Sequence, residues 1–196
     1  KLKYLVKSIC KYANILICES DLGKKDIIEI FNIDPSKIIV RLNLPNNSFK
    51  TISNTSRKSL TNQFEKLNKN NFLLLPSRWG QYKNQERVIR ALERYNDEKG
   101  ENLKLVLTGI RKSVKQVNSF LTENKLSNKN IIIYETVSVK ELIQLYQNAY
   151  ALIFPSLLGP TSLPLFEALE NNCPIITSNL EGHIEVLDQA AIYVDP

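Results

Sequence analysis

From residue 71 onward, short apolar runs alternate regularly with segments whose apolar residues recur at helical spacing. The runs have the length of buried strands, and they are FLLLP (72–76), KLVLT (104–108), NIIIY (130–134), YALIF (150–154), PIIT (174–177) and AIYV (191–194). Helical patterns lie between them, at residues 85–98, 112–125, 138–149, 163–171 and 182–188. Continuous apolar strands that alternate with amphipathic helices predict an α/β fold, a doubly wound parallel sheet with helices on both faces.

The first 45 residues contain only one α/β unit of this kind. Its predicted elements are a helix at 2–13, a strand at 14–19, a helix at 21–31 and a strand at 37–42. Ser20 and Asp21 are suitable caps for the second helix, and Pro35 marks the turn after it. Residues 46–70 are rich in Asn, Ser, Thr and Lys, which is typical of an exposed linker. We therefore predict a terminal α/β unit at 1–45, a linker at 46–70 and a separate domain at 71–196.

The composition is that of a soluble globular protein, because 43% of the residues are hydrophobic and 23% are charged. No apolar run is long enough to span a bilayer, and no signal-peptide pattern is present. The cysteines, Cys10, Cys18 and Cys173, lack CxxC spacing, which favours a reducing, cytoplasmic location and argues against a zinc site. The chain has no Met and begins inside an amphipathic pattern, so we expect it to be a fragment of a longer protein.

The net charge of +6 is concentrated in the first 70 residues, which carry 13 Lys and Arg against 6 Asp and Glu. The remaining residues carry 13 against 14 and have no basic stripe interleaved with aromatic residues, so nucleic acid is not an expected partner. The basic N-terminal part has two interpretations. It is either a solvated face and linker, or a surface attracted to anionic lipid or to a phosphorylated acceptor. The second interpretation would give peripheral association with the inner face of the membrane.

Ligands of open α/β sheets bind outside the carboxyl ends of the strands, so the loops after the strands are the expected site. Arg78 and Lys83 lie in the first of these loops, within LLLPSRWGQYKN. An Arg fork and a Lys point charge at one sheet edge suit a diphosphate. The alternative is that both are solvated surface cations. Trp79 and Tyr82, in the same loop, are more typical of packing residues than of platforms for ring stacking.

The stretch GPTSLPLFEAL switches from a loop to a helix that we expect to begin at about Leu163, because Pro is favoured in the first helical turn. Backbone N–H groups around Thr161, Ser162 and Leu163 would lie at the positive end of this helix, where phosphate binds. Helical side chains lean toward the N-terminus, so Glu167 would reach a ligand beside the helix start, for example the two hydroxyls of a ribose. The alternative is that Glu167 only complements the helix dipole.

Other positions after the strands carry weaker signals. Gly109 permits either a turn or close approach of the backbone to a ligand. Thr136 and Val137 either contact a nucleotide base through their backbone or simply connect a strand to a helix. His183, the only histidine, has no nucleophile or acidic pair at a suitable spacing, and we expect a surface or capping residue there. The absence of GxGxxG, P-loop and HExxH motifs excludes the common dinucleotide-binding, NTP-hydrolysing and zinc-protease classes.

Several of these segments share their order and spacing with one enzyme family. They are PSRWGQYKN, LVLTG, VSVKELIQLYQNA, LIFPSLLGPTSLPLFEAL, CPIITSN and AAIYVDP. Residues 71–196 resemble the nucleotide-sugar-binding half of the retaining GT-B glycosyltransferases of family 4, the glycosyl transferases group 1. Residues 1–45 look like the last α/β unit of that family's acceptor-binding half. The resemblance implies two Rossmann-like domains that face each other across a cleft.

The resemblance also implies roles for particular residues. The family's diphosphate-binding cations correspond to Arg78 and Lys83, which would carry the catalysis, and its ribose-binding glutamate corresponds to Glu167. Its backbone donors around the donor sugar correspond to Thr161, Ser162 and Leu163. With Gly109, Thr136 and Val137, proposed above from their positions after the strands, these complete the expected donor-binding residues. The implied reaction transfers a sugar from a nucleoside diphosphate sugar to a glycan or lipid-linked acceptor in bacterial polysaccharide synthesis. It needs neither a metal nor another cofactor, since the two cations would neutralise the diphosphate.

One position departs from the family pattern. The pattern E-x7-E expects Glu at 159, where this chain has Gly159. GPTSLP is similar to a variant among bacterial polysaccharide and lipopolysaccharide transferases, so the departure does not by itself indicate an inactive enzyme. It nevertheless motivates one alternative, a non-catalytic module that binds a nucleotide sugar or acts as a scaffold. A separate alternative, an epimerase of sugar nucleotides, would need catalytic acids and a histidine that this half of the sequence does not place.

Overall fold

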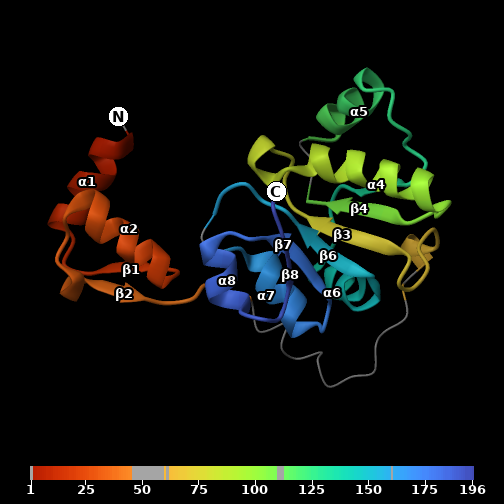
Figure 1. The fold of residues 1–196 in the computed structure, drawn as a ribbon. Helices are drawn as coiled ribbons and strands as arrows, with labels where there is room; N and C mark the ends of the chain where they lie inside the picture. Colours follow the sequence, from red (N-terminus) through yellow and green to blue (C-terminus); the bar gives the residue numbers. More distant parts are fainter. Residues whose placement is uncertain (1, 46–59, 61, 110–112, 160) are drawn as a thin grey trace.

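The computed structural model describes residues 2–45, 60, 62–109, 113–159 and 161–196. Within these residues the strands form two parallel sheets, one of two strands and one of six (Figure 1). The six-stranded sheet has the order β5-β4-β3-β6-β7-β8, and every neighbouring pair in it is parallel. Helices lie on its two faces, so the predicted doubly wound α/β fold is confirmed. Residues 46–59 and 61 of the predicted linker lie outside the described part of the chain.

The N-terminal unit contains a single parallel βαβ crossover. Its elements are α1 (Leu2–Tyr12), β1 (Leu16–Cys18), α2 (Asp21–Phe31), the 3-10 turn η1 (Pro35–Lys37) and β2 (Ile38–Val40). Ser20 caps α2 as predicted, because its hydroxyl accepts a hydrogen bond of 2.9 Å from the backbone N–H of Gly23. The helix ends at Asn32, which adopts the left-handed conformation common after helices. β1 and β2 are three residues each, so this unit buries little by itself.

The strands of the larger sheet lie within one or two residues of their predicted positions. They are β3 (Phe72–Pro76), β4 (Lys104–Thr108), β5 (Ile131–Tyr134), β6 (Ala151–Phe154), β7 (Ile175–Ser178) and β8 (Ile192–Val194). The helices and 3-10 turns are η2 (Asn62–Phe64), η3 (Gln81–Lys83), α4 (Gln85–Lys99), α5 (Val114–Glu123), α6 (Val139–Asn148), α7 (Leu163–Glu170) and α8 (Glu181–Leu187). The capping box of α6 is complete, since Ser138 and Glu141 each bond the backbone N–H of the other.

The core consists of two apolar clusters, one on each face of the sheet. Leu74 belongs to the cluster that contains Ile143 of α6 and Leu165 of α7. Leu75, the next residue of β3, belongs to the cluster that contains Val88 and Leu92 of α4. Successive residues of a strand point to opposite faces, so a strand buried on both faces must be apolar at every position. This explains why β3 reads as an uninterrupted apolar run.

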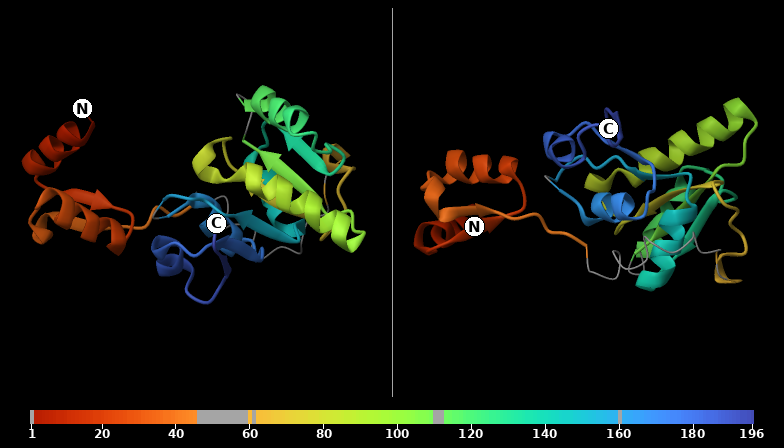
Figure 2. Two further views of the ribbon diagram at one scale, coloured as in Figure 1. Left: turned by 45° about the horizontal axis from the view of Figure 1, so that its top comes forward. Right: turned by 90° about the horizontal axis from the view of Figure 1, so that it is seen from below.

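The chain reverses its direction across the sheet between β3 and β6. It moves outward from β3 through β4 to β5, then returns to β6 and continues through β7 to β8 at the opposite edge. The loops that follow β3 and β6 therefore diverge toward opposite faces, which creates a crevice at the carboxyl ends of these two strands. Figure 2 shows that the β1–β2 unit lies to one side, beside the half of the domain that carries α7 and α8.

Leu74 tests this account of the core, because its side chain is fully buried in the central strand. We expect Leu74→Ala to lower the free energy of unfolding by about 2 to 5 kcal/mol, since it removes buried methyl groups and leaves a cavity. Ile192→Ala, on the 64% exposed Ile192 of edge strand β8, is the control and should cost less than about 1 kcal/mol. Urea denaturation followed by circular dichroism measures both, and equal losses would contradict the assignment.

Candidate active site at the carboxyl edge of the sheet

Lys83 lies in the crevice between the loops that follow β3 and β6. Its ammonium nitrogen is 4.5 Å from the ring centroid of Phe154, at the end of β6, and 5.1 Å from that of Tyr82. Burial of this half-buried side chain lowers the pKa of Lys83. Aromatic faces attract a cation but replace only part of its hydration. The ammonium group is therefore suited to an anionic ligand that enters the crevice.

Hydrogen bonds join the loop of Lys83 to the loop that leads into α7. The backbone carbonyl of Tyr82 accepts a bond of 2.7 Å from the N–H of Leu157 and one of 3.1 Å from the hydroxyl of Ser156. The carbonyl of Ser156 in turn accepts a bond of 2.6 Å from the hydroxyl of Ser178, at the end of β7. The carboxyl ends of β3, β6 and β7 are thus connected around Lys83.

Arg78 lies in the same loop on its exposed side. The side chain of Gln85, which is buried at the start of α4, donates a hydrogen bond of 2.6 Å to the carbonyl of Arg78 and accepts one of 3.2 Å from the N–H of Gly80. The backbone at Arg78 is therefore fixed. Its guanidinium group forms no hydrogen bond or ion pair with the described residues. Arg78 and Lys83 thus belong to the same loop after β3. Their joint contact with one diphosphate stays a prediction.

Glu167 is held at a defined position by a buried phenol. The hydroxyl of Tyr146, which lies on α6 and is fully buried, donates a hydrogen bond of 2.7 Å to Oε2 of Glu167. Burial raises the pKa of Glu167, and the bond from Tyr146 partly opposes that rise. Burial also raises the pKa of Tyr146 well above its ordinary value, so the phenol remains a donor. The second carboxylate oxygen, Oε1, has no partner within the described ranges and is available to a ligand.

The alternative that Glu167 only complements the helix dipole is wrong. α7 begins at Leu163, as predicted, and no acidic residue lies in its first turn. Glu167 is in the second turn, where the attraction of the helix N-terminus has largely decayed. Its half-buried position and its bond from Tyr146 point to a more specific role.

The chain passes from an extended loop into α7 at the position that the sequence predicts. Ser162 is the N-cap residue with extended backbone angles, its side chain makes no capping bond, and Leu163 is 41% exposed. The hydroxyl of Thr161 donates a hydrogen bond of 2.9 Å to Oε2 of Glu19 in the N-terminal unit. Gly159 has φ +125°, a conformation that residues with a side chain rarely adopt. Glu at this position would therefore be strained, which gives a physical reason why this chain departs from the E-x7-E pattern at Gly159. Pro160 lies outside the described residues.

Gly109, Thr136 and Val137 line one cavity of about 280 Å³ at the carboxyl ends of β3, β4 and β5. Its lining is Pro76, Thr108, Gly109, Glu135, Thr136, Val137 and Leu142. Gly109 has φ +77°, so the turn there needs the freedom of glycine. The structure thus brings together three residues that the sequence could only suggest one by one.

Sequence reasoning missed Thr108 in this cavity. Its hydroxyl is buried and has no hydrogen-bond partner among the residues described, although buried polar atoms are usually paired. An unpaired hydroxyl in the lining of a cavity favours a polar ligand. The signal was present in the sequence, because Thr108 ends the run KLVLT at the carboxyl edge of the sheet.

The expectation that His183 is a surface or capping residue is wrong, since the side chain is fully buried beside Phe154. Its Nδ1 lies 2.9 Å from the hydroxyl of Thr177, which donates its single proton to the carbonyl of Phe154. Nδ1 of His183 must therefore be the donor to Thr177. Burial lowers the pKa of His183, a backbone hydrogen bond at Ser178 partly opposes this, and the charge of Lys83 adds to the lowering, so the neutral ring is favoured. His183 lies in the short helix α8, which begins directly after β7. This tight connection buries a polar side chain that would otherwise be expected at the surface.

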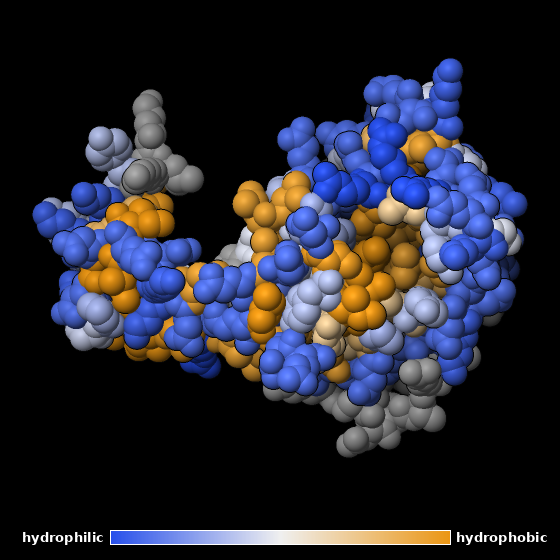
Figure 3. Space-filling model, in the orientation of Figure 1, coloured by the Kyte–Doolittle hydropathy of each residue, from blue (hydrophilic) through white to orange (hydrophobic). Residues whose placement is uncertain are grey.

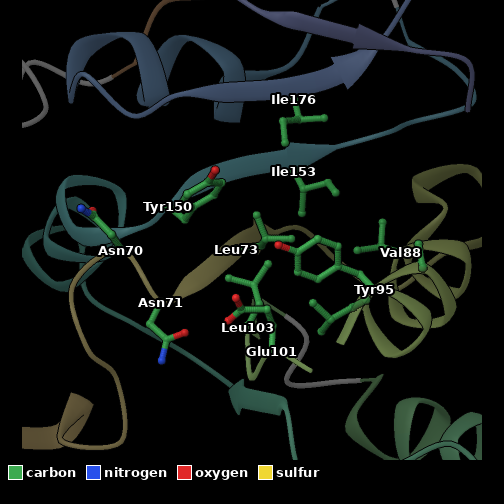
Figure 4. A pocket seen from close by; sticks show the side chains of 12 residues that line it. Asn70, Asn71, Leu73, Val88, Tyr95, Glu101, Leu103, Tyr150, Ile153 and Ile176 are labelled. Atoms are coloured by element: carbon green, nitrogen blue, oxygen red, sulfur yellow. The ribbon is translucent and has the colours of Figure 1, made fainter. Parts of the chain in front are cut away.

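A larger cavity, of about 530 Å³, lies elsewhere and is mostly apolar (Figure 4). Asn71 and Leu103, which line it, precede β3 and β4, so this cavity lies toward the amino ends of the strands. Ile153 and Ile176 form part of its wall where α4 does not cover the sheet. Figure 3 shows apolar side chains in a hollow below α4. The cavity therefore does not belong to the crevice around Lys83.

In the described ranges, no three His, Cys, Asp or Glu side chains are grouped so that they would hold a metal ion. None of the helices that the structure describes combines the length and the apolar character needed to cross a membrane.

The raised pKa of Glu167 predicts a pH dependence of stability. The folded chain binds this proton more tightly than the unfolded chain, so stability is lost as pH rises from the ordinary value of 4.5 through the raised pKa. Glu167→Gln can still accept the bond from Tyr146 but cannot ionise. We expect its free energy of unfolding, measured by urea denaturation, to rise relative to wild type as pH increases above 4.5. A difference that is independent of pH would contradict the burial of this carboxylate.

The fold is similar to that of known structures, of which the chain covers about half the length. The chain superposes with a TM-score of 0.74 on HepE of Anabaena, crystallised with UDP-glucose, at 17% sequence identity over 100% of this chain and 53% of that one. It superposes with a TM-score of 0.77 on sucrose-phosphate synthase of Thermosynechococcus elongatus, at 15% identity over 99% of this chain and 48% of that one. These likenesses show the GT-B type of Rossmann-like fold.

Two curated relatives align with the chain over nearly its whole length. The O-antigen chain mannosyltransferase RfbU of Salmonella typhimurium is 28% identical over 194 residues, which are 99% of this chain and 50% of the relative. The O-antigen chain mannosyltransferase B of Escherichia coli is 23% identical, over 100% of this chain and 52% of the relative. The chain thus spans about half the length of the curated relatives it matches. The family model described as glycosyl transferases group 1 matches residues 56–195, and the chain belongs to this family of GT-B glycosyltransferases.

Proposed function

We propose that this chain is the nucleotide-sugar-binding part of a retaining glycosyltransferase, joined to the end of its acceptor-binding domain. The observation that carries the proposal is the position of Lys83, whose partly desolvated ammonium lies at the switch point of the sheet beside the loop into α7. An anion in this crevice would meet the ammonium and the amino end of α7 together.

Each part of the donor has a proposed partner. The base occupies the cavity lined by Gly109, Thr136 and Val137, with the unpaired hydroxyl of Thr108 as an additional contact. The ribose hydroxyls donate to the free oxygen of Glu167. The pyrophosphate contacts Arg78, Lys83 and the amino end of α7, and the backbone N–H groups of Thr161, Ser162 and Leu163 surround the donor sugar, an arrangement supported by the hydrogen bonds between the two loops.

The proposed chemistry depends on charge. When the bond between the sugar and the diphosphate breaks, negative charge develops on the leaving oxygen. Arg78, Lys83 and the amino end of α7 would stabilise that charge in the transition state more than in the ground state, which lowers the barrier. The two cations take the part that a divalent metal has in other transferases, so we propose that neither a metal nor another cofactor is required.

The names of the relatives support a more specific proposal. Both are O-antigen chain mannosyltransferases, so we infer a role in the synthesis of a bacterial surface polysaccharide, with mannose as the first donor sugar to test. The acceptor would be a growing glycan or a lipid-linked sugar. A cytoplasmic enzyme would meet such an acceptor at the inner face of the membrane, where its basic N-terminal part would favour anionic lipid.

Removing the charge of Lys83 should weaken binding of the nucleoside diphosphate. We expect Lys83→Ala to reduce the affinity for UDP or GDP, measured by titration calorimetry, by about tenfold or more, because one charge-assisted contact is lost. Lys99→Ala is the matched control, since Lys99 carries the same charge but lies at the far end of α4, away from the loop of Lys83. Equal binding by wild type and Lys83→Ala would exclude the diphosphate role.

The full-length protein separates an enzyme from a non-catalytic binding module, the alternative that Gly159 motivates. We expect it to transfer sugar from a radiolabelled donor to an acceptor, and Arg78→Ala or Lys83→Ala to lower turnover by about two to three orders of magnitude. Binding of the donor without transfer to any acceptor would favour the scaffold. Isomerised donor in the absence of acceptor would instead favour an epimerase.

A further inference from the structure

Two carboxylates join the turn between β1 and α2 to the donor-binding domain. Glu185, on α8, accepts hydrogen bonds from the backbone N–H groups of Asp21 at 2.7 Å and Leu22 at 3.0 Å. In the opposite direction, Glu19 of the turn accepts the bond of 2.9 Å from the hydroxyl of Thr161. These residues lie more than 140 positions apart in the chain, so no local sequence pattern indicates the contacts.

Glu185 satisfies two of the backbone N–H groups at the amino end of α2. The first four N–H groups of a helix lack partners within the regular helical pattern. In α2, Glu185 accepts from Asp21 and Leu22, and the hydroxyl of Ser20 accepts from Gly23 at 2.9 Å, before the regular pattern begins with the bond of 3.0 Å from Lys24 to the carbonyl of Ser20. A carboxylate at this end is also favoured by the helix dipole. Glu185 therefore fixes the position of the turn that carries Glu19.

Glu19 is held at the place where the donor is proposed to bind. Its side chain is exposed, and only Oε2 is bonded, to Thr161 at the entrance of α7. None of the described residues accepts a hydrogen bond from the backbone N–H of Thr161, so this group remains available to a ligand. Gly159, two residues earlier, contributes no side chain and has a conformation that disfavours one. Glu19 is thus the carboxylate that the structure brings to this loop.

The chemistry of a carboxylate decides which part of the donor it can meet. A diphosphate would be repelled by Glu19, whereas the hydroxyl groups of a sugar are hydrogen-bond donors that its free oxygen can accept. Resting on the proposed function, we propose that Glu19 binds hydroxyl groups of the donor's sugar, and that Glu185 is a positioning residue that holds Glu19 there. Specificity for the sugar would then depend on a residue of the N-terminal unit.

The affinities of paired ligands test this role. Titration calorimetry on this chain compares UDP with UDP-glucose and GDP with GDP-mannose. We expect Glu19→Gln to weaken binding of the sugar nucleotide about tenfold and to leave binding of the matching diphosphate unchanged within about twofold. Glu185→Gln should weaken the sugar nucleotide in the same direction. It should also speed amide hydrogen exchange at Asp21 and Leu22, since one amide oxygen cannot replace two.

Glu29→Gln is the matched control, because Glu29 is an exposed acid on the same helix α2, and it should change neither affinity. If Glu19→Gln affects both ligands equally, or strengthens the sugar nucleotide, the inference is wrong. The proposed function then still stands, provided that Lys83→Ala weakens the diphosphate. If wild type binds none of the four ligands, the proposed function fails and the role of Glu19 fails with it.

Discussion

The parallel pairing of β3 with β6 is the constraint on which the candidate site depends. Leu73 and Leu74 of β3 lie opposite Ala151 and Leu152 of β6, although 78 residues separate each pair. The chain leaves these strands toward opposite faces, so their loops diverge and leave a crevice at the carboxyl ends. The bonds from Leu157 and Ser156 to the carbonyl of Tyr82 then join the loops across its base. Lys83 owes its position to this junction.

The site combines partly buried charges of both signs. Burial lowers the pKa of Lys83 and raises that of Glu167, so each group is less stable in its charged form than it would be in water. Lys83 lies over the rings of Phe154 and Tyr82, and Glu167 is bonded by the phenol of Tyr146. Such groups gain more than exposed ones when a ligand supplies the missing partner. The same burial that costs stability therefore prepares the crevice for binding.

The N-terminal unit contributes to this region through polar contacts rather than through a shared core. Its β1–α2 turn meets α8 and the entrance of α7 by hydrogen bonds to carboxylates. Such contacts are directional, so they orient the turn while burying little apolar surface. They also connect the N-terminal unit with residues proposed to contact the donor.

The order and nearly all bounds of the helices and strands follow from the amino-acid sequence, because continuous apolar runs and helical spacing report burial directly. The edge of the sheet at which Arg78, Lys83 and Gly109 lie also follows from it, since that edge depends on strand direction. Which side chains meet depends instead on the three-dimensional packing. Tyr146 beside Glu167, the unpaired Thr108, the buried His183 and the bond from Thr161 to Glu19 all join elements distant in the chain. No local pattern encodes such pairs, because they arise from how helices pack across the sheet and how the two units meet.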